Sequence, residues 1–292
     1  MVLGIDIGGT YIKFLVLEKG SILYRNKIRT GVSADEVVDG IFTEYERLQQ
    51  SYRIRSVGIG FPGTVEQGLV TADNLPFRDY PLKKKLEERM HCKVSIENDA
   101  NCAALGELHY GCGREFQNMV LLTLGTGIGG GIVIDGKLVR GTGLAGEFGH
   151  MVIQAEGGRD CPCGQRGCWE QYASAAALMR SAAQAADFYQ ESRLYALYEK
   201  NEKRMDGMCF FQALKEHCGV AERVFTEYIH YLCVGLENIR NILAPECIVL
   251  AGGITEEREL ILAWLKNELP SDIKVRISAL GNDAGAMGAA SL

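Results

Sequence analysis

Three cysteines, one histidine and two glutamates fall within one short stretch of the chain, residues 145–170. Cys161, Cys163 and Cys168 follow the spacing C-x-C-x4-C, and the glycines between them supply turns, so the three thiolates can converge on one point. His150 would be the fourth ligand. Three thiolates and an imidazole in tetrahedral geometry favour zinc, and a complete set of four protein ligands predicts a structural role for the metal.

Two glutamates lie next to these predicted ligands. Glu147 precedes His150 by three residues and Glu170 follows Cys168 by two, so folding of the metal loop would bring both carboxylates to its edge. Acidic acceptors held in this way suit the hydroxyl groups of a sugar. The alternatives are buried free cysteines with a solvated pair of glutamates, or a disulfide, but close cysteine spacing with interleaved glycines favours a metal site.

The length and composition indicate a cytosolic protein of two domains. With 292 residues, 47% of them hydrophobic, the chain can bury a large core, and its length favours two domains. A formal charge of −6 argues against a nucleic-acid partner. No basic leader and no apolar run long enough for a bilayer occurs, which predicts a cytoplasmic protein without a membrane partner. In a cytoplasmic protein, we interpret its ten cysteines as free core residues plus one metal cluster.

Two glycine-rich turns follow buried strands, one in each half of the chain. In the first turn, Gly8 and Gly9 allow close approach of a ligand, Thr10 offers a hydroxyl and Lys13 can reach a phosphate. An ordinary tight hairpin is the alternative. The second turn contains Thr126 and Gly127 and continues as a strand, unlike a dinucleotide-binding loop, which must open a helix. Together the two turns resemble a duplicated phosphate clamp.

Polar residues also follow two other predicted strands. The strand 93–97 delivers Asn98 and Asp99 to the start of a helix, and open α/β sheets bind ligands at such strand ends. Asp99 would lie at the positive end of the helix, although it could simply be the N-cap. The buried strand 54–61 ends at a turn containing Gly63, which leads toward the segment 74–76 containing Asn74. Both turns could border a ligand cleft.

The domain crossing is predicted in the polar, glycine-rich segment 111–118. The predicted domains are residues 1–117 plus 281–292, and residues 118–280. Helices are expected in the second half of the chain over 174–219, 220–243, 255–268 and 282–291, and Pro245 should end the second of them. The aromatic residues of 174–219 are assigned no chemistry. Gly253, in a turn after the buried strand 247–251, could receive the flat face of a nucleotide base.

These segments together resemble the ROK family of sugar kinases, within the actin, hexokinase and Hsp70 superfamily. The resemblance runs from Leu3 to Ala290 and rests on DIGGTYIK, GIGFPGTV, ENDANCAALGE, TLGTGIGGG, GEFGH, CPCGQRGCWE and AGGI. It implies an α/β fold with two ribonuclease-H-like domains of the actin and hexokinase type around an interdomain cleft. It also implies ATP and Mg²⁺ as cofactors beside the structural Zn²⁺.

The resemblance implies a role for each matching residue. Asp99 matches the general base that takes the proton from the 6-hydroxyl of the sugar as that oxygen attacks the γ-phosphate of ATP. The sugar's other hydroxyls are held at positions that match Asn98, Glu147, His150 and Glu170, and His150 also ligates zinc. Asp6 matches the residue near Mg²⁺ and the phosphates. The nucleotide-contacting turns of the family match Gly8, Gly9, Thr10, Lys13, Thr126, Gly127 and Gly253.

The expected activity is therefore an ATP-dependent hexose kinase, with glucose as the first substrate. N-acetylmannosamine, fructose and allose are the alternative sugars. Many family members are repressors with an N-terminal helix-turn-helix, and DIGGT starting at Asp6 favours the enzyme. An ATPase that activates a partner through an iron–sulfur cluster needs no acidic sugar pocket, and a silent sugar sensor should lack Asp99. A homodimer is expected from the resemblance and from the aromatic helices.

Overall fold

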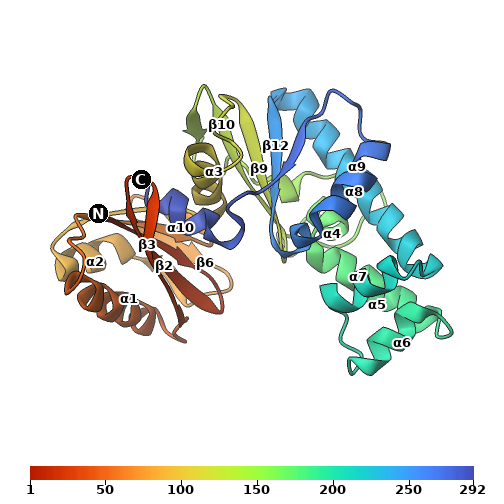
Figure 1. The fold of residues 1–292 in the computed structure, drawn as a ribbon, viewed down its shortest axis with the longest axis horizontal. Coiled ribbons are helices and arrows are strands. Elements are labelled where there is room, and N and C mark those ends of the chain that lie inside the picture. The colour runs from red at the N-terminus through yellow and green to blue at the C-terminus, as the bar shows by residue number, and fades with distance from the viewer. The chain divides into compact units, whose positions relative to one another are not determined.

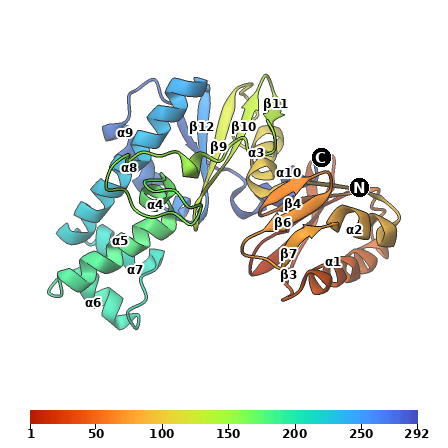
Figure 2. The same ribbon diagram turned by 180° about the vertical axis from the view of Figure 1, so that it is seen from behind.

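The computed structural model describes residues 1–292 and confirms the α/β class. It separates into two compact units. The first unit contains residues 1–121, 130–146 and 278–292, and the second contains residues 122–129 and 147–277. Both units contain strands and helices (Figures 1 and 2).

The first unit is built on a five-stranded sheet in the order β3-β2-β1-β4-β8. β1 pairs antiparallel with β2 and parallel with β4, and β4 pairs parallel with β8. The bounds of these strands are β1 (Val2–Ile7), β2 (Tyr11–Glu18), β3 (Ser21–Arg29), β4 (Ser56–Phe61) and β8 (Lys93–Asn98). The carboxyl ends of β1, β4 and β8 therefore lie at one edge of the sheet, where the predicted site residues follow them.

Both faces of this sheet are apolar, as the alternation along β2 shows. Ile12, Phe14 and Val16 belong to the core with α1 and α2, whereas Leu15 and Leu17 pack with the C-terminal helix. Successive side chains of a strand point to opposite faces, so one strand serves two helix layers. The helices of this unit are α1 (Ala34–Gln49), α2 (Leu82–Met90), α3 (Asp99–Tyr110) and α10 (Ala284–Ala289).

The C-terminal helix α10 packs closer to the sheet and to α3 than side chains would permit. A Cβ on Gly58 of β4 would lie 1.7 Å from the Ala289 carbonyl oxygen, and one on Gly288 would lie 1.6 Å from the Cys102 oxygen. The sequence predicted a helix over 282–291. The structure instead has a 3-10 turn at Gly281–Asp283 before the shorter helix.

A buried carboxylate anchors the segment that leads into α10. Glu107, on α3, accepts hydrogen bonds from Ser278 Oγ at 2.6 Å, from the Leu280 amide at 2.9 Å and from the Cys112 amide at 2.8 Å. Burial opposes the charge on Glu107, but these hydrogen bonds outweigh it and hold the pKa of the carboxyl below its usual value. The C-terminal segment is thus fixed to α3 by charge-assisted bonds as well as by close packing.

A small antiparallel sheet was missed in the sequence. The stretch that was interpreted as two turns, around Gly63 and Asn74, contains three short strands in the order β5-β6-β7. They are β5 (Thr64–Glu66), β6 (Leu69–Ala72) and β7 (Phe77–Tyr80). Strands of three or four residues beside glycine, asparagine and proline carry too little alternation to be recognised locally.

A second five-stranded sheet has the order β11-β10-β9-β12-β13. Its bounds are β9 (Met119–Leu124), β10 (Ile128–Ile134), β11 (Lys137–Val139), β12 (Cys247–Ala251) and β13 (Val275–Ile277). β12 is completely buried, as expected for an inner strand with a continuous apolar sequence.

The remaining helices belong to the second unit. They are α4 (Glu170–Ala173), α5 (Ala175–Phe188), α6 (Arg193–Lys200), α7 (Gly207–Lys215), α8 (Gly219–Leu243) and α9 (Arg258–Glu268), with 3-10 turns η1 (Phe148–His150) and η2 (Gly253–Glu257). α8 ends as predicted before Pro245, through Ala244 in the left-handed conformation. The helix predicted from residue 255 begins only at 258 because η2 precedes it. None of the helices is long and apolar enough to cross a membrane.

The close packing of α10 yields a prediction for stability. Gly58→Ala should lower the free energy of unfolding by about 1–3 kcal/mol, the usual cost of overpacking, because its methyl group would collide with the Ala289 carbonyl. Gly219→Ala is the matched control, since its Cβ meets no atom within 4 Å and alanine favours the helix it begins. Urea denaturation measures both, and equal stability of Gly58→Ala and the parent would contradict the packing.

Candidate active site

The predicted base lies at the first turn of α3, but it is not the N-cap. Asn98 has that role, because its Oδ1 accepts from the Ala100 amide at 2.9 Å and from the Asn101 amide at 3.2 Å. Asp99 Oδ1 accepts from the Ala100 amide at 2.8 Å. The interpretation of Asp99 as the cap is therefore wrong. The helix has its own cap, and Asp99 lies in the first turn, near the positive end of the helix dipole.

Asn98 also connects α3 to the turn that contains Gly63. Its Nδ2 donates to the Gly63 carbonyl oxygen at 3.3 Å. A Cβ on Gly63 would lie 2.2 Å from the Thr71 oxygen, so the turn can pack against β6 only with glycine at this position. Asn74, in contrast, is exposed in the turn between β6 and β7, and no hydrogen bond ties it to Asn98.

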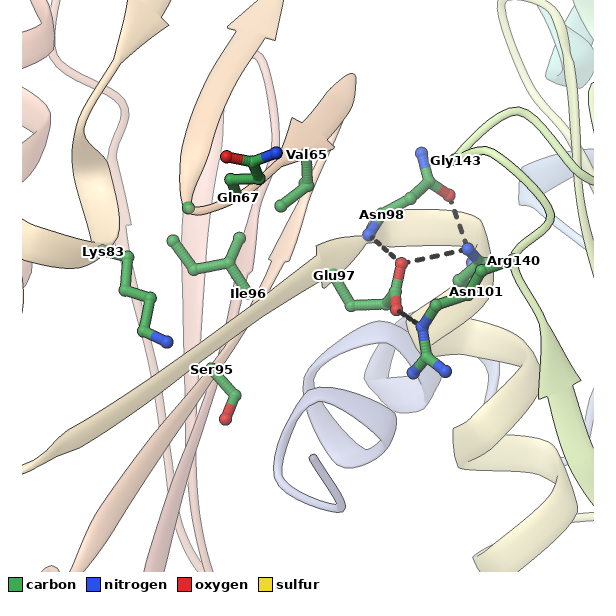
Figure 3. Close-up of a pocket in the computed structure, with 11 residues that line it drawn as sticks. Val65, Gln67, Lys83, Ser95, Ile96, Glu97, Asn98, Asn101, Arg140 and Gly143 are labelled. Carbon is green, nitrogen blue, oxygen red and sulfur yellow. Dashed lines mark hydrogen bonds and ion pairs between the residues drawn. The ribbon is translucent and has the colours of Figure 1, made fainter.

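A polar cavity of about 490 Å³ lies beside Asn98 in the first unit. Glu97 lines this cavity, and Figure 3 shows its side chain facing Arg140 and Asn101. Glu97 Oε2 accepts from Arg140 Nε at 2.6 Å, and Oε1 accepts from the Asn98 amide and from Asn101 Nδ2. Sequence reasoning missed both members of this ion pair, since 43 residues separate them and no motif joins them.

The first glycine turn joins β1 to β2 and carries the predicted phosphate ligands. Gly9 and Thr10 are exposed, and a Cβ on Gly9 would meet no atom within 4 Å, so the backbone there is open to a ligand. Lys13 Nζ lies 3.0 Å from Asp6 Oδ2 and donates to the Asn282 carbonyl oxygen at 3.1 Å. The structure therefore brings the predicted phosphate and magnesium residues together, and adds the C-terminal segment to them.

In the second unit, the four predicted metal ligands form one cluster. The ligand atoms of His150, Cys161, Cys163 and Cys168 all lie within 4.8 Å of one another. Cys163 and Cys168 Sγ are 3.6 Å apart, and Cys161 Sγ is 3.7 Å from His150 Nδ1. A tetrahedron with zinc–sulfur bonds of about 2.3 Å has edges of roughly 3.8 Å. The donor atoms thus fit a zinc ion with no large movement.

The thiols of this cluster differ in their acidity. Burial raises the pKa of Cys161 to about 12 and also raises that of Cys168. The backbone amide of Gln165 lowers the pKa of the exposed Cys163. Because a metal binds thiolates, a cation in the cluster would displace the protons that burial otherwise favours.

The metal loop is anchored to α8 by one aromatic side chain. Trp169 lies between Cys168 and Glu170 in sequence and is completely buried. Its Nε1 donates to the Tyr231 carbonyl oxygen at 2.7 Å. A Cβ on Gly235 would lie 2.0 Å from the indole ring, so this glycine provides the space that the tryptophan occupies.

Of the two predicted sugar-binding glutamates, Glu170 contacts the cluster with its side chain, and Glu147 is joined to it through the backbone. Glu170 Oε1 is 3.2 Å from Cys161 Sγ and 4.0 Å from His150 Nδ1. Glu147 is exposed, and its carbonyl oxygen accepts from the His150 amide at 3.1 Å. The carboxylate of Glu170 is therefore placed by residues of the cluster, whereas Glu147 is joined to His150 through its backbone.

The second glycine turn adjoins Glu170. A Cβ on Gly127 would lie 2.3 Å from Glu170 Oε2, and the neighbouring Thr126 is exposed. The turn and the metal loop lie in different parts of the sequence. In the folded second unit the turn and the loop are in contact, because glycine at position 127 leaves room for the carboxylate.

Gly253 lines a mainly apolar cavity of about 540 Å³ in the second unit. Met179, Met208 and Phe211 form its apolar wall. Sequence reasoning assigned no chemistry to Phe211 and did not single out the two methionines. They come from α5 and α7, which reach the turn after β12 only through tertiary folding.

The predicted site residues consequently form one set in each unit. The first unit holds Asp6, Gly8, Gly9, Thr10, Lys13, Gly63, Asn74, Asn98 and Asp99, and the second holds Thr126, Gly127, Glu147, His150, Glu170 and Gly253 with the cysteine cluster. Each set includes a glycine turn and polar groups suited to hydroxyls.

Known proteins are similar to this chain in both sequence and fold. The chain is 38% identical to a glucokinase of Streptomyces coelicolor, covering all of this chain and 97% of that protein. It is 31% identical to the xylose repressor of Bacillus subtilis, covering 99% of this chain and 76% of the repressor. Among solved structures, a ROK family glucokinase from Streptomyces griseus in complex with glucose and AMPPNP superposes with a TM-score of 0.86 at 36% identity, covering 99% of this chain and 98% of the other.

These similarities extend over the whole length that carries the two sets of residues. The sequence matches the ROK family over residues 2–292. Together with the two glycine turns, the capped start of α3 and the cysteine cluster, this match shows that the chain belongs to the ROK family.

Proposed function

We propose that this chain is an ATP-dependent hexose kinase that phosphorylates the 6-hydroxyl of glucose. The observation that carries the proposal is the start of α3, where Asn98 caps the helix and Asp99 lies in its first turn, at the position that matches the general base of the family. Similarity to glucokinases, one of them solved with glucose and AMPPNP, supports the substrate pair. A xylose repressor is also similar, but a repressor needs no general base.

In the proposed reaction, Asp99 accepts the proton of the attacking hydroxyl. Asn98, Glu147, His150 and Glu170 hold other hydroxyls of the sugar, and Gly63 and Asn74 border the sugar site. Phosphoryl transfer depends mainly on positioning and on stabilising charge. The residues therefore have to orient the acceptor oxygen, and the base is needed only as that oxygen attacks.

The nucleotide would be held by backbone and small side chains. Gly8, Gly9 and Thr10 with Lys13 would bind phosphates in the first unit, and Thr126 with Gly127 would do so in the second. Magnesium, held near Asp6, would neutralise phosphate charge when bound. The apolar cavity at Gly253 is of a size and character suited to the base of ATP.

We also propose a structural zinc ion at His150, Cys161, Cys163 and Cys168. Four protein donors leave no position for a reacting water, so the ion would act by fixing the loop. A cytoplasmic homodimer completes the proposal. Exposed aromatic side chains support the dimer, with Phe188 78% and Tyr189 42% exposed at the end of α5. A monomer mass by light scattering at micromolar concentration would contradict it.

The activity is tested by ATP consumption with a panel of sugars. Glucose should give the highest kcat/KM among glucose, mannose, fructose, allose and N-acetylmannosamine. A higher kcat/KM for another hexose would change the proposed substrate but not the proposed reaction. The absence of turnover with every hexose would refute the kinase.

Asp99→Asn should lower kcat by about a hundredfold to ten-thousandfold, the usual effect of removing a general base. Because Asn98 caps α3, the fold and the sugar affinity should persist. Asp35→Asn is the matched control, an aspartate in the first turn of α1 in the same unit, and it should keep full activity. Turnover of Asp99→Asn within a few-fold of the parent would show that Asp99 is not the base.

Cys163→Ser should contain less zinc, unfold at a lower temperature and bind sugar more weakly. Nucleotide affinity should fall less, because only the Gly127 turn adjoins Glu170 and the other phosphate turn belongs to the first unit. Cys218→Ser is the control, since Cys218 precedes α8 and serine suits a helix N-cap. Metal content, sugar binding and nucleotide binding are measured on the same samples. Full sugar affinity without zinc would show that the metal is incidental.

A further inference from the structure

The loop of residues 141–146 leads directly to Glu147 and contains neither helix nor strand. Gly141, Gly143 and Gly146 all have positive φ, so the loop gains little order from intrinsic backbone preference. The backbone hydrogen bonds of the loop converge on one residue, Arg140. The Arg140 carbonyl oxygen accepts from the Gly143 amide at 2.8 Å and from the Ala145 amide at 3.4 Å.

The side chain of the same arginine reaches the end of β8, directly before α3. Arg140 Nε donates to Glu97 Oε2 at 2.6 Å. The guanidinium side chain is 55% exposed, but the Glu97 side chain is only 11% exposed. An ion pair with one buried member is screened less than a surface pair. The carbonyl of Arg140 therefore organises the loop, and its side chain binds Glu97 at the end of β8, directly before α3.

The other oxygen of Glu97 organises the first turn of α3. Oε1 accepts from the Asn98 amide at 3.0 Å and from Asn101 Nδ2 at 3.1 Å, and Figure 3 shows these groups around the carboxylate. The Asn101 Oδ1 atom is buried without a hydrogen-bond partner. The bond to Glu97 thus sets the orientation of the Asn101 amide, because a flipped amide would bring its oxygen against the carboxylate.

We propose that Arg140 and Glu97 are positioning residues that hold the loop ending before Glu147 and the start of α3, with Asn98 and Asp99, in one arrangement before a sugar binds. The inference rests on the proposed function, since the start of α3 contains Asn98 and Asp99 and the loop leads directly to Glu147, all of them predicted sugar ligands. Pre-ordering of these segments lowers the entropy that sugar binding must overcome. Neither residue contacts the reacting atoms in this proposal, so their loss should weaken sugar binding more than ATP binding.

Arg140→Gln, Glu97→Gln and the double variant test the proposal. Arg140→Gln should raise the KM for the sugar about tenfold, as expected for a charge-assisted hydrogen bond that is partly exposed, and leave the KM for ATP within twofold. The double variant should be no worse than the more impaired single variant, since both changes break the same bond. Arg89→Gln is the matched control, because Arg89 forms an equally short ion pair with Asp39 on the same unit, and it should behave as the parent.

Hydrogen exchange of the ligand-free protein is a second measurement that does not need activity. In Arg140→Gln, amides of residues 141–146 and of Asn98–Asn101 should both exchange faster. Unchanged exchange in either segment would overturn the proposal. Equal rises in the KM values for sugar and for ATP would also overturn it. So would a rise in the sugar KM of the double variant that equals the product of the two single rises. If the parent phosphorylates no hexose, the proposed function fails, and hydrogen exchange still decides whether Arg140 holds the two segments together.

Discussion

The first unit depends on a backbone contact that excludes side chains. The Ala289 oxygen of α10 occupies the space that a Cβ on Gly58 would need, and the Cys102 oxygen of α3 occupies the space that a Cβ on Gly288 would need. Interiors are packed too densely for such a contact to yield by even one methyl group. The last residues of the chain therefore complete the layer on which β4, β8 and α3 rest, and those elements present the candidate base.

Buried carboxylates reinforce this packing, each with a full set of donors. Glu107 joins α3 to Ser278 and Leu280, and Glu97 joins the start of α3 to Arg140. A buried charge is costly unless it is paired and hydrogen-bonded. Once its donors are in place, however, it selects one arrangement of the segments that supply them. The two glutamates thus fix both ends of the helix that carries Asp99.

In the second unit, the loop next to the candidate site is ordered by different chemistry. This loop of residues 151–168 has only isolated β-bridges, so it cannot rely on a regular ladder for its shape. The four converging donors and the buried Trp169 provide order instead. Glu170 follows Trp169 directly, and its carboxylate lies against Cys161. The contacts that fix the conformation of the loop therefore also fix the sugar pocket that we propose.

The sequence by itself determined the family, the α/β class and most of the candidate residues. Glycine turns, cysteine spacing and apolar periodicity are local features, and each reports its own segment. The spacing C-x-C-x4-C with His150 correctly indicated four donors that meet, since short turns leave them few other arrangements. The small sheet β5-β6-β7 escaped detection because its strands are too short to show a pattern.

Only the tertiary structure decided how these segments act on one another. That Asn98 and not Asp99 caps α3, that Glu97 pairs with Arg140, and that Gly127 touches Glu170 all depend on side-chain directions and on contacts between distant parts of the chain. Such contacts are set by packing and by the pairing of buried charge. A sequence motif contains the residues that can make them, but the choice among possible partners is made only when the chain is folded.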